Sequence, residues 1–170
     1  LEGSINERVR FFVRQLLTAL LLTLTPVIAH GDPSLLVNAQ AITPSLLTDI
    51  RYASSNNFIG RPVAGYKAPL CLLSEAASMA LGRAQELALS RNLSLLVYDC
   101  YRPQRAVDDF VDWVFGIAPE PTKRAYYPSL ERSSLIDLGY IASKSGHSRA
   151  STVDLTLVDS ATGQPLDMGT

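Results

Sequence analysis

The sequence predicts a small α+β domain, because helical and extended segments follow one another without a regular β-α-β alternation. Three segments support this prediction. Residues 72–92 carry apolar side chains at three- and four-residue spacing, residues 93–98 form a short apolar run, and residues 152–158 alternate between apolar and polar side chains. With 170 residues and 47% hydrophobic side chains, the chain is long enough to bury one core.

Loops and short strands are expected first along the chain, since residues 32–70 are rich in Pro, Gly, Asn and Ser. The helical spacing then predicts a helix over residues 72–92, with Ser74 as its N-cap. The apolar run at residues 93–98 predicts a buried strand, and residues 99–102 form a turn at its end.

A second helix is expected after this turn. Pro103 suits its first position, and apolar residues on one face continue until the helix ends near Gly116. Residues 117–128 contain three prolines and predict a loop, and residues 129–138 predict a short helix that ends at Gly139.

The last strand is expected over residues 152–158. Its alternation places Val153, Leu155 and Leu157 on one side and Asp154 on the opposite side. A carboxylate on a strand needs a partner, because burying it unpaired is costly.

The charge balance excludes an electrostatic footprint for nucleic acid, since Lys and Arg total 15 and Asp and Glu total 16, for a net charge of −1. No apolar run reaches the ~20 residues that a membrane-spanning helix needs.

The N-terminus has the features of a targeting segment. Three arginines, Arg8, Arg10 and Arg14, precede an apolar stretch over residues 16–29. We expect a signal peptide over residues 1–31 and an exported, periplasmic domain over residues 32–170 that keeps no stable membrane span after cleavage. A buried N-terminal helix and an uncleaved anchor are the alternatives.

Export would determine the redox state that we expect for the two cysteines. Cys71 and Cys100 would enter an oxidising compartment, where a pair tends to form a disulfide. Two buried free thiols are the alternative. The distance between them along the chain does not suit a cysteine-based metal site.

Few residues offer catalytic chemistry. His147 is the sole histidine of residues 32–170, and it precedes Asp154 by seven positions. An imidazole and a carboxylate from a loop and the adjacent strand form half of a zinc site, although a lone histidine is more often structural. The guanidinium of Arg102, at the strand-to-helix turn, suits an oxyanion or, alternatively, a salt bridge to Asp99.

Five ordered blocks carry a family resemblance. They are residues 49–53 (DIRYA), 56–60 (NNFIG), 99–103 (DCYRP), 126–128 (YYP) and a last block from 145–149 (SGHSR) through 153–157 (VDLTL). Together they resemble the VanX-type D-alanyl-D-alanine dipeptidases over about residues 46–170.

The resemblance implies a zinc metallopeptidase in which helices pack on a short, mainly antiparallel sheet. It implies that His147 and Asp154 bind Zn²⁺ and that Arg102 stabilises the transition state. We assign Ser145 and Tyr52 to substrate binding, although the turn-rich segment that contains Tyr52 is alternatively a surface loop. The implied reaction is hydrolysis of the free dipeptide D-Ala-D-Ala to two D-alanines.

The sequence departs from the family in one respect. The family has a later E-x-x-H segment that supplies a third zinc ligand and a general base, and no histidine follows His147 here. We expect a fragment of a longer protein, or a truncated reading frame, that is inactive by itself. The alternatives are a D,D-carboxypeptidase or peptidoglycan peptidase of the same fold, and a catalytically dead exported module that binds cell-wall peptides. Dipeptide recycling in the periplasm is expected rather than vancomycin-type resistance.

Overall fold

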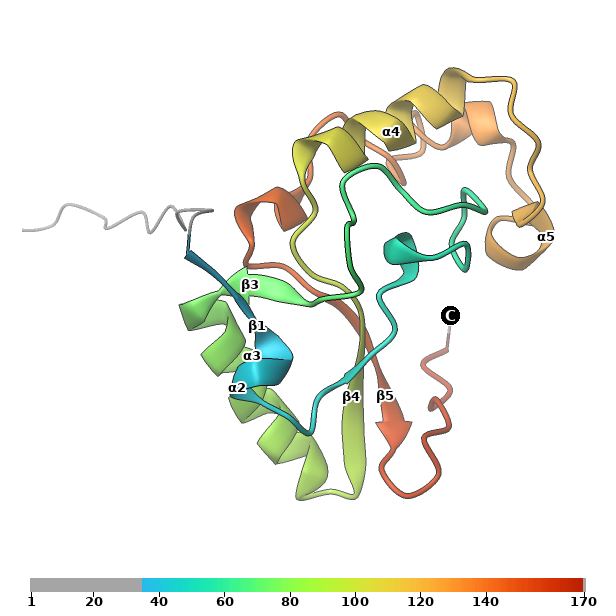
Figure 1. The fold of residues 1–170 in the computed structure, drawn as a ribbon. Helices are drawn as coiled ribbons and strands as arrows, with labels where there is room; N and C mark the ends of the chain where they lie inside the picture. Colours follow the sequence, from blue (N-terminus) through green and yellow to red (C-terminus); the bar gives the residue numbers. More distant parts are fainter. Residues whose placement is uncertain (1–34, 170) are drawn as a thin grey trace, which may run out of the picture. The chain divides into compact units, whose positions relative to one another are not determined.

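A computed structural model describes residues 35–169, so the predicted signal peptide over residues 1–31 lies outside the described residues. The described chain is α+β, as the sequence predicts (Figure 1). A three-stranded sheet has the order β2 (Leu47–Thr48), β4 (Leu93–Asp99), β5 (Asp154–Asp159). The short β2 pairs with β4 in parallel, and β5 pairs with β4 antiparallel. The central strand β4 therefore pairs with both of the other strands in this sheet.

A second, two-stranded sheet pairs β1 (Leu36–Asn38) with β3 (Leu72–Ser74) antiparallel. The short helix α2 (Ala39–Ile42) follows β1 directly. The structure corrects the start of the predicted helix, because residues 72–74 are strand β3. Ser74 is the N-cap, as predicted: its side chain accepts a hydrogen bond from the backbone N–H of Ala77.

Helix α3 (Glu75–Leu89) packs against β4, as Figure 1 shows. Their contact forms the larger of two hydrophobic clusters, which we call the strand cluster. Its buried members are Ala39, Leu46, Ile50, Cys71, Leu73, Leu81, Ala88, Leu95, Val97 and Cys100. β4 is thus buried, as its apolar run predicts.

Helix α4 (Gln104–Phe115) ends at Gly116, as predicted, but Pro103 is its N-cap rather than its first helical residue. The buried side of α4 forms the second cluster, which we call the aromatic cluster. Its members are Ile59, Val63, Ala106, Phe110, Trp113, Val114, Tyr127, Leu135 and Ile141. Phe58 packs its ring edge-on against both Phe110 and Trp113.

The segment after α4 differs from the prediction. The predicted loop contains a short helix, α5 (Lys123–Tyr126). The predicted helix over residues 129–138 is wrong, since only the 3₁₀ helix η3 (Arg132–Ser134) and turns form there. In this segment the guanidinium of Arg132 donates to the carbonyls of Gly116 and Ala118 and lies over the Trp113 ring, so the segment is held against the end of α4. Tertiary contacts therefore override a weak local preference.

The last strand has the predicted alternation but not a uniformly buried apolar side. Leu155 and Leu157 are the cross-strand partners of Val97 and Leu95, so they share a face with the strand cluster. Yet Leu155 is 40% exposed, whereas Val158 on the opposite side is fully buried. Among residues 35–169, no helix is long and apolar enough to cross a membrane.

Candidate metal and substrate site

Three segments meet at the end of β4. The strand ends at Asp99, the next residue is Cys100, and a disulfide joins Cys100 to Cys71 beside β3. The structure therefore favours the disulfide over the two free thiols. The turn at residues 99–102 is thus linked covalently to the chain before β3.

His147 lies in a 3₁₀ helix, η4 (Gly146–Arg149), that packs against this turn. The Ser145 hydroxyl caps η4 by accepting the backbone N–H of His147 at 3.2 Å. Ala150 ends η4 in the left-handed conformation, at φ 57°, and its N–H bonds the carbonyl of His147. These local bonds explain how a polar, loop-like sequence holds a buried imidazole in one place.

The two ring nitrogens of His147 have different partners. Nδ1 lies 2.8 Å from the carbonyl oxygen of Cys100, and Nε2 lies 3.3 Å from Oδ1 of Asp154. Because a carbonyl only accepts hydrogen bonds, Nδ1 donates and carries the hydrogen. Nε2 is then free to offer its lone pair beside the Asp154 carboxylate.

Asp154 begins β5, as the alternation predicts, and its side chain is about half exposed. In the protonated form of His147 both ring nitrogens carry a hydrogen, and the hydrogen bond that Nε2 then donates holds the pKa of Asp154 below its usual value, against the effect of burial. For His147, burial lowers the pKa, but the bonds to Asp154 and to the Cys100 carbonyl outweigh it and raise the pKa overall. Each group therefore stabilises the charged form of the other: the carboxylate of Asp154 and the imidazolium of His147.

Arg102 is held by the buried carboxylate of Asp99. Its Nε and Nη2 donate to Oδ2 of Asp99 at 3.0 and 2.7 Å, so the salt bridge considered from the sequence is present. Tyr66 donates its hydroxyl to Oδ1 of the same carboxylate at 2.7 Å. Burial raises the pKa of Asp99, and Arg102 and Tyr66 oppose that rise. Arg102 also lies 3.5 Å from Asp154, so the salt bridge does not remove it from the site.

The donor set fits a metal ion. Two ligands of a tetrahedral zinc ion, each about 2.0–2.1 Å from the metal, lie about 3.3 Å apart. The observed separation between Nε2 of His147 and Oδ1 of Asp154 has this value. Asp99 also belongs to the cluster, but its oxygens face Nδ1 and are bonded to Arg102 and Tyr66. His147 and Asp154 are thus the two donors able to share an ion.

A cavity of about 370 Å³ opens over this pair. Its polar side is formed by Arg102, Lys144, Ser145, His147 and Asp154, and its apolar side includes Tyr52, Phe58 and Phe110. The volume suits a small ligand. All five residues predicted from the sequence therefore line one cavity.

Tyr52 contributes its ring to the cavity wall. The ring packs against Phe110 and Tyr66, and the guanidinium of Arg102 lies 5.1 Å from its centroid. Burial raises the pKa of Tyr52 to about 12, so its hydroxyl stays protonated at neutral pH. The structure therefore places Tyr52 in the cavity wall rather than on a surface loop.

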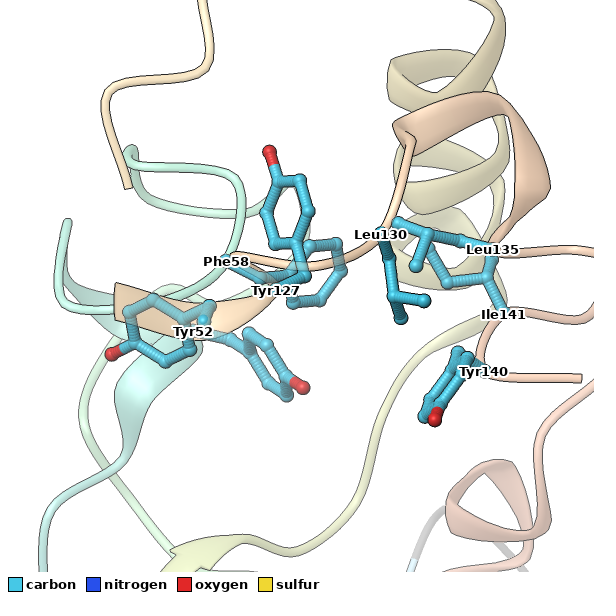
Figure 2. Close-up of a pocket in the computed structure, with 8 residues that line it drawn as sticks. Tyr52, Phe58, Tyr127, Leu130, Leu135, Tyr140 and Ile141 are labelled. Carbon is cyan, nitrogen blue, oxygen red and sulfur yellow. The ribbon is translucent and has the colours of Figure 1, made fainter. Parts of the chain in front are cut away.

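A second cavity, of about 240 Å³, shares Tyr52, Phe58, Tyr140 and Ile141 with the first. Figure 2 shows its lining, which is almost entirely aromatic and aliphatic and includes Tyr127, Leu130, Leu135, Tyr140 and Ile141. These residues come from the segment whose structure the sequence mispredicts, and its pattern gave no sign of the cavity.

Sequence reasoning also missed the positions of Tyr66 and Lys144. The sequence indicates Asp99 only as a partner of Arg102, although an acidic residue that ends a buried apolar strand is itself a signal of a buried polar network. Tyr66 carries no comparable signal, because its contact with Asp99 joins residues 33 positions apart.

An imidazole and a carboxylate placed to share one ion, with an arginine in the same small cavity, form a candidate metal site of the kind found in metallohydrolases. The sequence model of the Peptidase M15 family, described as D-ala-D-ala dipeptidase, matches residues 33–170. The chain belongs to this family.

The chain is also similar to curated relatives named D-alanyl-D-alanine dipeptidase. It is 47% identical to the one from Streptomyces coelicolor and 45% identical to the one from Enterococcus faecalis, each over 121 residues that make up 71% of this chain and 60% of the relative. The Escherichia coli relative is 32% identical over 139 residues, 82% of this chain and 61% of that protein. The chain thus spans about 60% of the length of these relatives.

Proposed function

We propose that this chain carries part of the active site of a zinc-dependent dipeptidase that hydrolyses D-Ala-D-Ala to two D-alanines. The observation that carries the proposal is the pair of donors, Nε2 of His147 and Oδ1 of Asp154, 3.3 Å apart in a cavity that also holds Arg102. Family membership and the names of the relatives support the substrate.

His147 and Asp154 would hold the zinc ion. When bound, zinc supplies a Lewis acid and lowers the pKa of water enough to make it a nucleophile near neutral pH. Catalytic zinc normally has three protein ligands. The proposal therefore requires a third ligand and a proton acceptor, as the family's E-x-x-H segment would provide.

Arg102 would act on the substrate rather than on the metal. Attack on a peptide carbonyl places negative charge on its oxygen, and a charged donor fixed in advance stabilises that charge. Two bonds to Asp99 hold the guanidinium in place, and the rings of Tyr52 and Phe110 lie against it. Asp99 is thus a positioning residue for Arg102.

The rest of the cavity suits a short peptide with a free carboxylate. In a dipeptide the terminal carboxylate lies a few bonds from the scissile carbonyl, so its partner must be close to the metal. Lys144 and Ser145 line the same cavity as His147, and Lys144 is the cation there that has no carboxylate within salt-bridge distance among residues 35–169. We assign the substrate carboxylate to Lys144 and Ser145, and the methyl groups to Tyr52 and Phe58.

The site of action follows from the targeting segment. We place the protein in the periplasm, where it would recycle D-Ala-D-Ala. A buried disulfide supports export, because such bonds persist mainly in oxidising compartments.

The test uses the complete natural protein, purified with its zinc content measured by mass spectrometry. We expect one zinc per chain and release of D-alanine from D-Ala-D-Ala. Hydrolysis of N-acetyl-D-Ala-D-Ala with equal efficiency would instead indicate a D,D-carboxypeptidase. Zinc or peptide binding without hydrolysis of either compound would indicate a binding module and would refute the proposal.

Lys144 can be tested in the same assay. Lys144→Met should raise KM for D-Ala-D-Ala about tenfold or more, since a hydrogen bond between charged groups contributes about 1.5–3 kcal/mol. It should leave KM for the C-terminal amide of the dipeptide unchanged. Lys67→Met, which lies outside the cavity, is the matched control.

A further inference from the structure

The disulfide lies directly behind the metal site. Cys100 stands between Asp99 and Arg102 in the sequence, and its carbonyl oxygen accepts the hydrogen bond from Nδ1 of His147. Both cysteines are buried in the strand cluster, with at most 1% exposure. The disulfide therefore links the backbone that orients His147 to the buried strand cluster.

Regular strand pairing does not extend to the backbone around Cys100. The ladder between β4 and β5 shifts register between Val97 and Asp99, just before the cysteine. Beyond that point the Tyr101 N–H bonds the carbonyl of Leu72 at 2.9 Å, and the Arg102 N–H bonds the carbonyl of His147 at 3.3 Å. The disulfide is the one covalent tie of this turn to another segment.

The other end of the disulfide is held firmly. The carbonyl of Cys71 accepts the N–H of Ala39 at 2.8 Å, and the next residues form β3. At the end of β3, the N–H of Ser74 bonds the carbonyl of Ala150, which closes the turn that carries His147. Strand β3 thus bonds both the histidine turn and the Cys100 turn through its backbone, and the disulfide adds a covalent tie from Cys71, the residue before the strand.

We propose that the Cys71–Cys100 disulfide is a positioning element of the metal site, which fixes the Cys100 carbonyl and through it the ring of His147. The proposal rests on the metal site of the proposed function. Without the disulfide the Cys100 carbonyl can move away from Nδ1, and the ring loses its nearest hydrogen-bond partner, while Oδ2 of Asp99 remains 3.4 Å from Nδ1 as a more distant one. Loss of such an outer partner of a metal ligand typically weakens metal binding about 10–100-fold.

The test compares metal affinity with fold stability in the complete natural protein. The double variant C71A/C100A removes the disulfide without leaving thiols that bind metal. Leu46→Ala is the matched control, because Leu46 is buried in the same cluster but does not line the metal cavity. Zinc affinity is measured by competition with a chromophoric chelator at a temperature where circular dichroism shows every variant folded, and the visible spectrum of the Co²⁺ form reports the ligand geometry.

We expect C71A/C100A to bind zinc about 10–100-fold more weakly and to change the Co²⁺ spectrum. Leu46→Ala should lower Tm but keep the zinc affinity and the spectrum of the wild type. Unchanged zinc affinity in C71A/C100A would overturn the proposal. So would an equal loss of affinity in Leu46→Ala, because the disulfide would then act through general stability.

A second variant covers the case in which C71A/C100A does not fold. C71V/C100A also removes both thiols, but it refills part of the space that the buried disulfide leaves in the strand cluster. Its zinc affinity and Co²⁺ spectrum are measured in the same way, and a wild-type affinity and spectrum in the folded variant would overturn the proposal. Neither readout needs substrate, so a protein that hydrolyses nothing still tests it.

Discussion

The strand cluster and the aromatic cluster contribute different things to one site. The strand cluster underlies β4 and the disulfide, and it places Asp99, Cys100 and the His147 turn through backbone bonds. The aromatic cluster contributes side chains: Phe110 lies in it, and Phe58 and Tyr52 pack against it and form the apolar wall of the cavity. Backbone geometry therefore places the metal donors, and ring packing shapes the space for the substrate.

This division has a physical reason. A metal site needs its ligands held to within about half an ångström, and here hydrogen bonds and the disulfide restrain the backbone that carries them. A small apolar ligand needs a wall of the right size, and interlocking rings on loops and one helix supply it. The two clusters should therefore respond differently to mutation.

The largest effect is expected at His147. Under the proposed function, His147→Ala removes a zinc ligand, and zinc contributes several kcal/mol of transition-state stabilisation, so activity should fall roughly 10³-fold or more. Zinc content after dialysis, measured by mass spectrometry, should fall with it, while circular dichroism stays that of the wild type. Full zinc retention in His147→Ala would show that the ion binds elsewhere.

Arg102 should separate chemistry from metal binding. Arg102→Ala should lower kcat about 10²–10³-fold and leave the zinc content unchanged, since the guanidinium acts on the substrate. Arg102→Lys should not restore kcat, because an ammonium cannot make two bonds to Asp99 and also face the cavity. A kcat within tenfold of the wild type in Arg102→Ala would contradict the assigned role. Steady-state kinetics on D-Ala-D-Ala provide the measurement.

The aromatic cluster should affect stability more than metal binding. Trp113→Ala empties the centre of that cluster and should cost about 3–5 kcal/mol of unfolding free energy, with zinc affinity unchanged where the variant is folded. Trp113→Phe is the matched control. It should cost much less, because Nε1 of Trp113 is buried with no hydrogen-bond partner among residues 35–169 and its loss breaks no bond. Urea unfolding gives both values, and a loss of zinc affinity in Trp113→Ala would contradict the division between the clusters.

Local sequence patterns predicted the elements that have them. The helix α3, the strands β4 and β5 and the helix α4 were predicted, because each has a local apolar period and a cap or stop residue. His147, Asp154 and Arg102 were named from residue chemistry and from the family blocks, and the structure brings them together. Their catalytic roles stay predictions.

What the sequence did not predict depends on contacts between distant residues. Turns around η3 stand where a helix was expected, and Arg132 there bonds the carbonyls of Gly116 and Ala118, just beyond α4. The carbonyl of Cys100 has no side-chain signature, yet it determines which nitrogen of His147 faces Asp154. The spacing between the two cysteines left the disulfide open, because only their separation in space decides it.

The smallest effect is expected at an ion pair that ties the loop before β3 to α4. Arg61 donates two bonds to Asp109, at 2.8 and 2.7 Å, and holds the pKa of Asp109 below its usual value. Since the folded pKa is the lower one, the stabilisation is fully present above the unfolded-state pKa of about 3.9 and is lost as pH falls through the folded-state pKa.

Because Arg61 is half exposed, Asp109→Asn should cost only about 0.5–1 kcal/mol at pH 7. The difference from the wild type should shrink below about pH 4, and Asp108→Asn, on the same helix but bonded only to Gln104, should change little. Urea unfolding at pH 7 and pH 3 measures this, and a cost that does not depend on pH would mean that Asp109 acts through the Ala64 N–H bond rather than through its charge.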